Sequence, residues 1–308
     1  MLKAKVDHFT NISDIIPYRA KIDDEGLTLY KLLTKKLKLS KDAIKKLRKD
    51  YRIRVNGKYL NYHSTIVQAD DLIEFNFNFM EETNFLPEAI PLNIIYEDQH
   101  LLVVNKAAGM LVHPSHNENT QTLGNAVLHH LRREGNYNTF RPIHRLDRNT
   151  SGLILIAKNI YAHNYLTKQF QEQKIHREYL AFVHGIIPHD FENISAPIAR
   201  INDSIIQRKV DFTHGKNATT HYQVIKRYSD RTLVRLKLAT GRTHQIRVHM
   251  SYIGHPLIGD DLYGGSNSLI SRQALHSYQL KFCLPFTHKE IKLKAELSDD
   301  IKLLKEIE

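Results

Sequence analysis

Residues 144–157, HRLDRNTSGLILIA, run from a polar, turn-prone loop directly into a continuous apolar segment. The apolar part, 153–157, predicts a buried strand. Loops positioned by rigid strands are where catalytic groups tend to lie. Asp147 stands in this loop between Arg145 and Arg148, whose charges favour an ionised carboxylate. Such a carboxylate can act as a nucleophile, as a general base or merely as a salt-bridge partner, and the spacing alone leaves all three open.

The chain around this loop alternates between strand and helix patterns. Residues 101–104 form another apolar run, and residues 234–238 alternate apolar with basic side chains, which is typical of a half-buried strand. Helical periodicity covers 122–132, 160–171 and 243–252, the last with Thr243 as its predicted N-cap. Because these elements do not repeat as strict strand–helix–strand units, we expect an α+β domain over residues 92–308.

The N-terminal part of the chain is strongly basic. Eleven Lys and Arg residues lie between Lys35 and Lys58, against two acids, Asp42 and Asp50. Opposite charges are too scarce for helical ion pairing to explain the pattern. A solvated surface helix would be the ordinary explanation, but we favour nucleic-acid binding through phosphate contacts.

Residues 13–78 read as one small α+β module. Leucines at helical spacing predict a helix over 27–37, and Ser40 looks like the N-cap of a second helix. Asn56-Gly57 is a strong turn signal because both residues tolerate positive φ, and residues 72–75 supply a closing strand. Residues 79–91 contain two prolines and little periodicity, so we expect a linker.

Composition excludes several classes of protein. The 308 residues are 42% hydrophobic and 25% charged, which is ordinary for a folded chain, and the net charge of +11 suggests a polyanionic partner. The single cysteine, Cys283, rules out a disulfide framework and any multi-cysteine zinc site. We found no metal-binding motif, no phosphate-binding glycine loop and no signal-peptide pattern. We therefore expect a cytoplasmic protein with no metal, no cofactor and no membrane association.

The loop motif resembles the signature of a known family. HRLDRNTSG (144–152) is similar to the signature of the RluA-type pseudouridine synthases, which isomerise uridine in RNA to its C-glycoside. Further segments resemble the family in the same order along the chain: 97–114, 177–185, 239–264 and 272–282. Residues 13–78 resemble the small RNA-binding module found in a ribosomal small-subunit protein, tyrosyl-tRNA synthetases and many RNA-modifying enzymes. Together they resemble the RluD-like branch, which acts on the ribosomal large subunit.

The resemblance implies a fold and a set of roles. The expected catalytic domain has a mixed, mainly antiparallel sheet with flanking helices. Asp147 corresponds to the catalytic carboxylate, Tyr179 to the tyrosine beside the target base, and Arg242 to the arginine that pairs with the aspartate. Arg145 corresponds to the residue that fills the space of the flipped base. The remaining residues expected to bind RNA are His113, Lys106 and Arg247 in the catalytic domain and Lys41, Lys45, Arg52 and Lys58 in the module.

Two departures from the family pattern and three alternatives accompany this interpretation. Ala107 stands where the family usually has proline, and Arg177 where it more often has lysine. rRNA is the favoured substrate and tRNA the alternative, acted on by a monomer. A catalytically silent RNA-binding or ribosome-assembly protein on the same scaffold is a second alternative, and a hydrolase that releases the base is a third.

Overall fold

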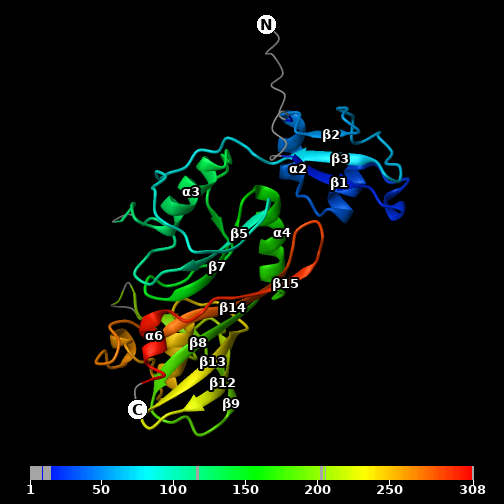
Figure 1. The fold of residues 1–308 in the computed structure, drawn as a ribbon. Helices are drawn as coiled ribbons and strands as arrows, with labels where there is room; N and C mark the ends of the chain where they lie inside the picture. Colours follow the sequence, from blue (N-terminus) through cyan, green and yellow to red (C-terminus); the bar gives the residue numbers. More distant parts are fainter. Residues whose placement is uncertain (1–8, 10–14, 116–117, 202–203, 205, 307–308) are drawn as a thin grey trace.

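The protein is described by a computed structural model that covers residues 9, 15–115, 118–201, 204 and 206–306. Its strands form a small sheet near the N-terminus and a large sheet that spans the rest of the chain (Figure 1). No helix within these described ranges has both the length and the apolar character needed to cross a membrane.

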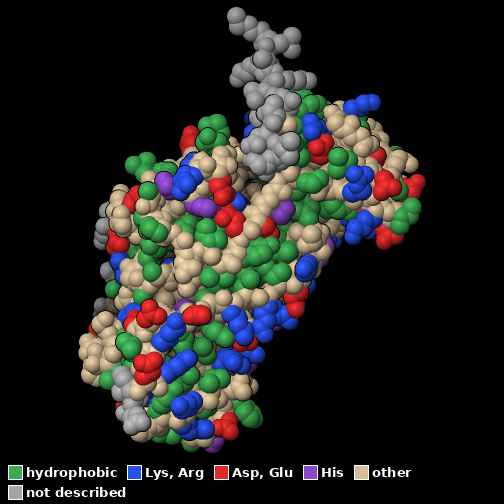
Figure 2. Space-filling view, viewed as in Figure 1, with side chains coloured by type: hydrophobic (Ala, Val, Ile, Leu, Met, Phe, Trp, Pro, Cys, Tyr) green, Lys and Arg blue, Asp and Glu red, His purple; other side chains and the backbone are tan. Residues whose placement is uncertain are grey.

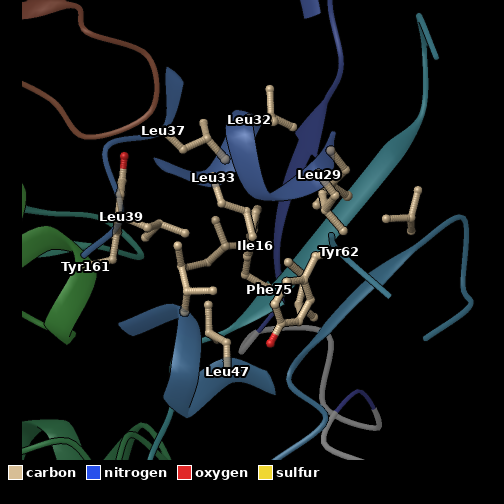
Figure 3. Close-up of a cluster of buried hydrophobic side chains, with 14 of the residues drawn as sticks. Ile16, Leu29, Leu32, Leu33, Leu37, Leu39, Leu47, Tyr62, Phe75 and Tyr161 are labelled. Atoms are coloured by element: carbon tan, nitrogen blue, oxygen red, sulfur yellow. The ribbon is translucent and has the colours of Figure 1, made fainter. Parts of the chain in front are cut away.

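The N-terminal module contains an antiparallel sheet in the order β1-β3-β2. Its strands are β1 (Ile15–Arg19), β2 (Ile53–Val55) and β3 (Leu72–Asn76). Its helical segments are η2 (Ile22–Asp24), α1 (Leu29–Lys31), η3 (Leu32–Lys36) and α2 (Lys41–Lys49). Leucines from α1, η3 and α2 pack with Ile16 and Phe75 of the sheet to form one core (Figure 3).

The expected helical region of the module is present, with one difference in its winding. The helix predicted over 27–37 begins at Leu29, and from Leu32 it widens into a π-helical turn in which the Leu37 amide donates to the Leu32 carbonyl at 3.0 Å. The second helix begins as predicted, because the Ser40 hydroxyl accepts a hydrogen bond from the Ala43 amide at 3.1 Å.

The turn predicted at Asn56-Gly57 is also present. Both residues have positive φ, 48° and 76°. The Val55 and Lys58 backbones bond to each other across the turn, at 2.8 and 2.9 Å, but the pairing stops there. Strand β2 instead pairs with β3, so the closing strand comes from residues 72–76.

The large sheet has the mixed, mainly antiparallel form that we expected. Ten strands of the described chain form it, in the order β4-β5-β7-β14-β8-β13-β12-β9, with β15 beside β14 and β6 beside β7. One pairing in this sheet, β7 with β14, is parallel. The strands are β4 (Ile94–Glu97), β5 (Leu101–Lys106), β6 (Arg141–Pro142), β7 (Ser151–Ala157), β8 (His176–His184), β9 (Phe191–Ser195), β12 (Thr219–Arg227), β13 (Arg231–Leu238), β14 (Leu275–Cys283) and β15 (Glu290–Lys294).

Helices cover parts of both faces, and a short hairpin stands beside the sheet. The helices are α3 (Leu123–Arg133), α4 (Ile160–Gln171), α5 (Gln245–Tyr252), η4 (Asp261–Tyr263) and α6 (Asp299–Leu303). The hairpin consists of β10 (Ile198–Arg200) and β11 (Arg208–Val210). The predicted N-cap of α5 was wrong: the helix begins at Gln245, and His244 precedes it with φ of 57°, in the left-handed region.

Gly152 lets the strand after the Asp147 loop lie against β14. Strand β7 pairs with β14 through Ser151 opposite His276 and Gly152 opposite Ser277. Gly152 has φ of 110°, and a Cβ on it would lie 2.3 Å from the Ser277 carbonyl oxygen. Only glycine fits here, because it lacks that atom. The last residue of the HRLDRNTSG motif is therefore required for sheet formation.

The segment predicted as a linker has no helix or strand but is bound along the catalytic domain. Glu81 forms an ion pair with Arg141 at 2.6 Å. Asn125, on α3, donates to the Leu86 carbonyl at 2.7 Å. Phe85 packs edge-on against Phe140. These contacts fix residues 81–86 in place. The boundaries 13–78, 79–91 and 92–308 stay a prediction.

The core of the module extends into the catalytic domain. Tyr161, on α4, is 1% exposed and belongs to the same buried cluster as the leucines of the module (Figure 3). Its ring stacks on Phe77 with centroids 5.6 Å apart. Asn164 of the same helix donates to the Ser40 hydroxyl at 3.3 Å. The module and α4 are therefore packed as one apolar unit.

Candidate functional site

Two adjoining hollows lie at the loop that precedes β7. A small cavity of about 80 Å³ contains Asp147, Tyr179 and Arg247 in its lining. A wider hollow of about 620 Å³ is lined by the 111–115 and 142–148 segments and by Arg242. Asp147 lines both, so its carboxylate lies where the two spaces meet.

The Asp147 carboxylate faces two basic side chains of the α5 region. Arg247 lies with Nη1 3.4 Å from Oδ2, and the Nε2 atom of His244 is 3.8 Å from the same oxygen. The Asp147 side chain is 28% exposed, so part of the carboxylate faces the open space. The flanking Arg148 turns away and donates to Glu118 at 3.0 Å. The charged group that contacts the carboxylate is therefore Arg247 of α5.

Arg247 is fixed by a second, fully buried carboxylate. Asp260, 1% exposed, accepts from Nε and Nη2 of Arg247, both at 2.7 Å. The guanidinium also lies over the Tyr263 ring, 4.9 Å from its centroid. This two-pronged contact orients the planar guanidinium and leaves Nη1 directed at Asp147.

The pairing expected of Arg242 is made by Arg247 instead. Arg242 lines both hollows, but its Nε donates to the Asn217 carbonyl at 3.0 Å. Arg242 is exposed and lies before the left-handed turn at His244. Arg247 lies after this turn and is buried on α5. The prediction that Arg242 holds the carboxylate was therefore wrong in its geometry.

Tyr179 lies in the wall of the smaller cavity, on β8. It is 4% exposed and packs among apolar side chains of the sheet. Burial raises the pKa of the phenol, so it keeps its proton near neutral pH. The position of Tyr179 therefore combines burial in the core with a place in the cavity wall.

Arg145 and His113 lie on the open side of the site. Arg145 is exposed and lines both hollows. His113 is exposed and lines the wider one, with its ring 4.8 Å from that of Phe140. Burial and the nearby Arg145 charge lower the pKa of His113, so its imidazole is neutral at physiological pH. Both positions are open to a bound RNA.

We expected Lys106 to bind RNA, but its side chain is buried. It is 1% exposed, and its Nζ donates to the carbonyls of Ala107, Met110 and Arg148 at 2.7, 2.9 and 2.9 Å. Burial, together with the Arg272 charge, lowers the pKa of Lys106 to about 7. Its contacts join the 106–110 loop, where Ala107 departs from the family pattern, to the Asp147 loop. Lys106 is thus a structural residue.

Arg177 is also buried beside the site. It is 8% exposed and lies over the Phe170 ring, 4.7 Å from its centroid. A Cβ on Gly241 would approach its Nη2 to 3.3 Å. A planar guanidinium suits this stacked, narrow position better than a lysine would.

Three of the four basic residues expected in the module are exposed. Lys41 and Lys45 project from α2, and Lys58 follows the Asn56-Gly57 turn. Lys and Arg side chains are visible on the surface of the module in Figure 2. Arg52 was predicted wrongly: it is 8% exposed, donates to Asn76 and to the Asn78 carbonyl, both at 2.9 Å, and lies under Phe79.

One group of side chains in the described ranges has the spacing of metal ligands. The ligand atoms of Glu97, His130 and Glu134 lie within 4.8 Å of one another. The Lys158 ammonium already contacts both carboxylates, at 2.7 and 3.1 Å. This lysine supplies the positive charge that a metal ion would bring, and none of the four residues lines the two hollows.

The sequence matches that of known enzymes over most of its length. The profile of the family described as RNA pseudouridylate synthase matches residues 100–252. The RNA pseudouridine synthase YjbO of Bacillus subtilis is 42% identical over 82% of this chain and 89% of its own. The chain belongs to the RNA pseudouridine synthase family. The "ribosomal large subunit pseudouridine synthase D" of Yersinia pestis is 37% identical over 85% of this chain and 84% of its own.

A solved structure agrees with this assignment. The human RNA pseudouridylate synthase domain containing 1 superposes with a TM-score of 0.57 at 28% identity, over 68% of this chain and 84% of its own. The protein is thus an RNA-modifying isomerase of the RluA type, with the RluD-like proteins among its relatives.

Two residues of this pseudouridine synthase site were not singled out from the sequence. Asp260 stands in GDDLYG (259–264), a segment whose resemblance to the family was evident but whose buried aspartate was given no role. His244 lies five residues from His249, off the same helical face, so the sequence indicates no metal site there and gives His244 no catalytic role. Its left-handed backbone, which brings Nε2 toward Asp147, follows from the turn before α5.

Proposed function

We propose that this enzyme converts uridines of large-subunit rRNA to pseudouridine, with Asp147 as the carboxylate that acts at the ribose. The proposal depends mainly on one observation: a half-open carboxylate at the junction of two hollows, with a fixed arginine 3.4 Å from one oxygen. An ionised and oriented carboxylate is the group that such a reaction requires.

The chemistry follows from the bonds that change. The N1–C1′ bond of uridine breaks, the base turns, and a C5–C1′ bond forms while C5 loses a proton and N1 gains one. The sugar becomes electron-poor when the base departs, and a carboxylate can stabilise or trap it, as glycosidase carboxylates do. The Asp147 side chain is 28% exposed and so accessible for this task, while Arg247 contacts its Oδ2 atom.

The other side chains of the site fit handling of an extruded base. A uridine within a stem must leave the stack to reach Asp147. Tyr179 lines the small cavity, and an aromatic ring at this place is suited to contact with uracil. Arg145, exposed at the rim, can fill the vacated space with its planar guanidinium.

The choice of rRNA rests on two further observations. Relatives at 37–42% identity carry the name ribosomal large subunit pseudouridine synthase D. The module adds an exposed basic face that suits a long, structured RNA with many phosphates. tRNA is the competing substrate.

The test compares the enzyme with an Asp147→Asn variant, which keeps the shape of the side chain and removes its charge. Tritium release from 5-tritiated large-subunit rRNA transcript measures turnover, and carbodiimide mapping locates the products. We expect turnover to fall at least about 1,000-fold with little change in RNA affinity. Asp299→Asn, at a side chain that is 97% exposed, is the matched control and should keep full activity.

Each outcome has a distinct meaning. Near-normal turnover in Asp147→Asn would exclude the proposed carboxylate. Turnover by the unaltered enzyme on tRNA but not on rRNA transcript would exclude the proposed substrate and leave the role of Asp147 in place. Release of free uracil would instead indicate hydrolysis of the base.

A further inference from the structure

A third hollow adjoins the catalytic site on the side of the β10–β11 hairpin. It measures about 410 Å³ and lies between this hairpin, the 214–216 segment and the residues that precede α5. Gly241, Arg242 and Thr243 line both this groove and the wider catalytic hollow. A strand of RNA that leaves the catalytic hollow past Arg242 would enter the groove directly.

The side chains that line the groove are basic. Arg200 and Arg208 come from the hairpin, Lys216 and His214 from the following loop, and Arg242 from the catalytic side. No Asp or Glu is among the described residues in its lining. Arg200, Lys216 and Arg242 are exposed, so their charges reach the open space.

Backbone carbonyls, rather than carboxylates, orient the guanidinium groups. Arg200 donates through Nε to the Ser204 carbonyl at 2.9 Å, and Arg242 to the Asn217 carbonyl at 3.0 Å. A carbonyl directs a guanidinium without neutralising its charge, and each group has five N–H donors. Within the described residues, Arg200, Lys216 and Arg242 form no ion pair.

Among the described residues, the acid nearest in sequence is Asp211, and it is already engaged, in part by His214 of the lining, whose Nδ1 lies 3.8 Å from Oδ1. Asp211 lies 3.6 Å from Lys209, and its carboxylate also accepts from the backbone amides of Thr213 and His214 at 2.9 Å. It shapes the turn that carries His214 and Lys216, while its charge is shared with Lys209. The groove thus keeps a local positive excess.

A second basic surface of the enzyme differs in this respect. Lys and Arg side chains gather over β14 and β15 in Figure 2, but acids lie among them. Lys281 is 3.0 Å from Glu290, and Lys237 is 3.2 Å from Glu178. The groove therefore differs in two ways: no Asp or Glu is among its described lining residues, and it is continuous with the site.

We infer that this groove binds the phosphodiester backbone of the RNA next to the target uridine. The inference rests on the proposed function and adds a subsite to it. Guanidinium and ammonium groups suit phosphate oxygens, and the charged side chains of the lining are all basic. The groove would bind the phosphates of the RNA strand and would not contact its bases. It would therefore raise the affinity for RNA independently of the base sequence around the target uridine.

The test removes the two most open charges, with Arg200→Glu and Lys216→Glu in one variant. Lys289→Glu with Lys292→Glu is the matched control, because both lysines are exposed, lie outside all three hollows and give the same change in net charge. Turnover of 5-tritiated large-subunit rRNA transcript and binding of unmodified transcript are measured at several salt concentrations. The full chain is used throughout.

We expect the groove variant to raise KM at least about tenfold and to leave kcat within about twofold of that of the unaltered enzyme. The slope of log affinity against log salt concentration should become shallower by about 1.5, because two phosphate contacts are lost. The control should change KM by less than about twofold. An Arg200→Gln and Lys216→Gln variant, which adds no repulsion, should show the same change of slope with a smaller change of KM. Melting curves identify any variant that fails to fold.

Other results would overturn the inference. A groove variant whose KM and salt slope match those of the control means that the RNA does not enter the groove, and an acidic protein partner would then be its occupant. If the unaltered enzyme turns over no rRNA transcript, the proposed function fails, but the salt slope of RNA binding still decides whether the groove contacts phosphates.

Discussion

Replacing Asp260 by Asn tests how the site holds Arg247. The carboxylate accepts two charge-assisted hydrogen bonds at 2.7 Å in a position that is 1% exposed. Two such bonds contribute about 4 kcal/mol, and an amide oxygen can restore about 1 kcal/mol of this through a single neutral contact. We therefore expect the free energy of unfolding to fall by about 3 kcal/mol, within the range for a broken buried ion pair.

Activity should fall as well, because a loosened Arg247 no longer fixes the Asp147 carboxylate. Urea unfolding followed by circular dichroism gives the stability, and single-turnover tritium release gives the rate. Asp261→Asn is the control: this neighbouring aspartate is exposed, and its replacement should cost less than about 0.5 kcal/mol. A loss below about 1 kcal/mol in Asp260→Asn would refute the view that the buried pair supports the site.

Three further predictions concern the basic residues. Arg52→Met should lower the free energy of unfolding by about 2 kcal/mol in urea and leave the salt slope of RNA binding unchanged, because Arg52 is buried against Asn76. The double variant Lys41→Gln with Lys45→Gln should change the free energy of unfolding by less than about 0.5 kcal/mol, because both lysines are exposed. It should make the salt slope of RNA binding shallower by about 1.5. Burial lowers the pKa of Lys106 from 10.5 to about 7. The unfolded chain therefore binds more protons between about pH 7 and pH 10, and stability should rise with pH by about 1 kcal/mol per unit there; urea titrations should show this rise lost in Lys106→Met.

Local patterns sufficed where the signal was itself local. The Ser40 cap, the leucines of α1 and η3 and the turn at Asn56-Gly57 depend on residues a few positions apart. The apolar runs of β5 and β7 predicted buried strands because a strand covered on both faces tolerates little else. The helix over 160–171 was predicted with the bounds that the structure has.

Prediction failed where distant residues decide the outcome. Lys106 is buried because a carbonyl 42 residues further along accepts its third hydrogen bond. Arg52 is buried because Phe79 and Asn76 pack against it, although it lies in a strongly basic stretch of the sequence. Arg247 contacts Asp147 in place of Arg242 because His244, with its left-handed backbone, redirects the chain before α5. Motif spacing carries none of this information.

The parallel contact between β7 and β14 also bears on when the enzyme can become active. Gly152 adjoins the catalytic loop, and its partner Ser277 is made more than a hundred residues later. During synthesis, the loop that carries Asp147 is completed long before the strand that supports it has left the ribosome. Because long-range pairings form late, we expect the nascent chain to remain inactive until residues 275–283 emerge.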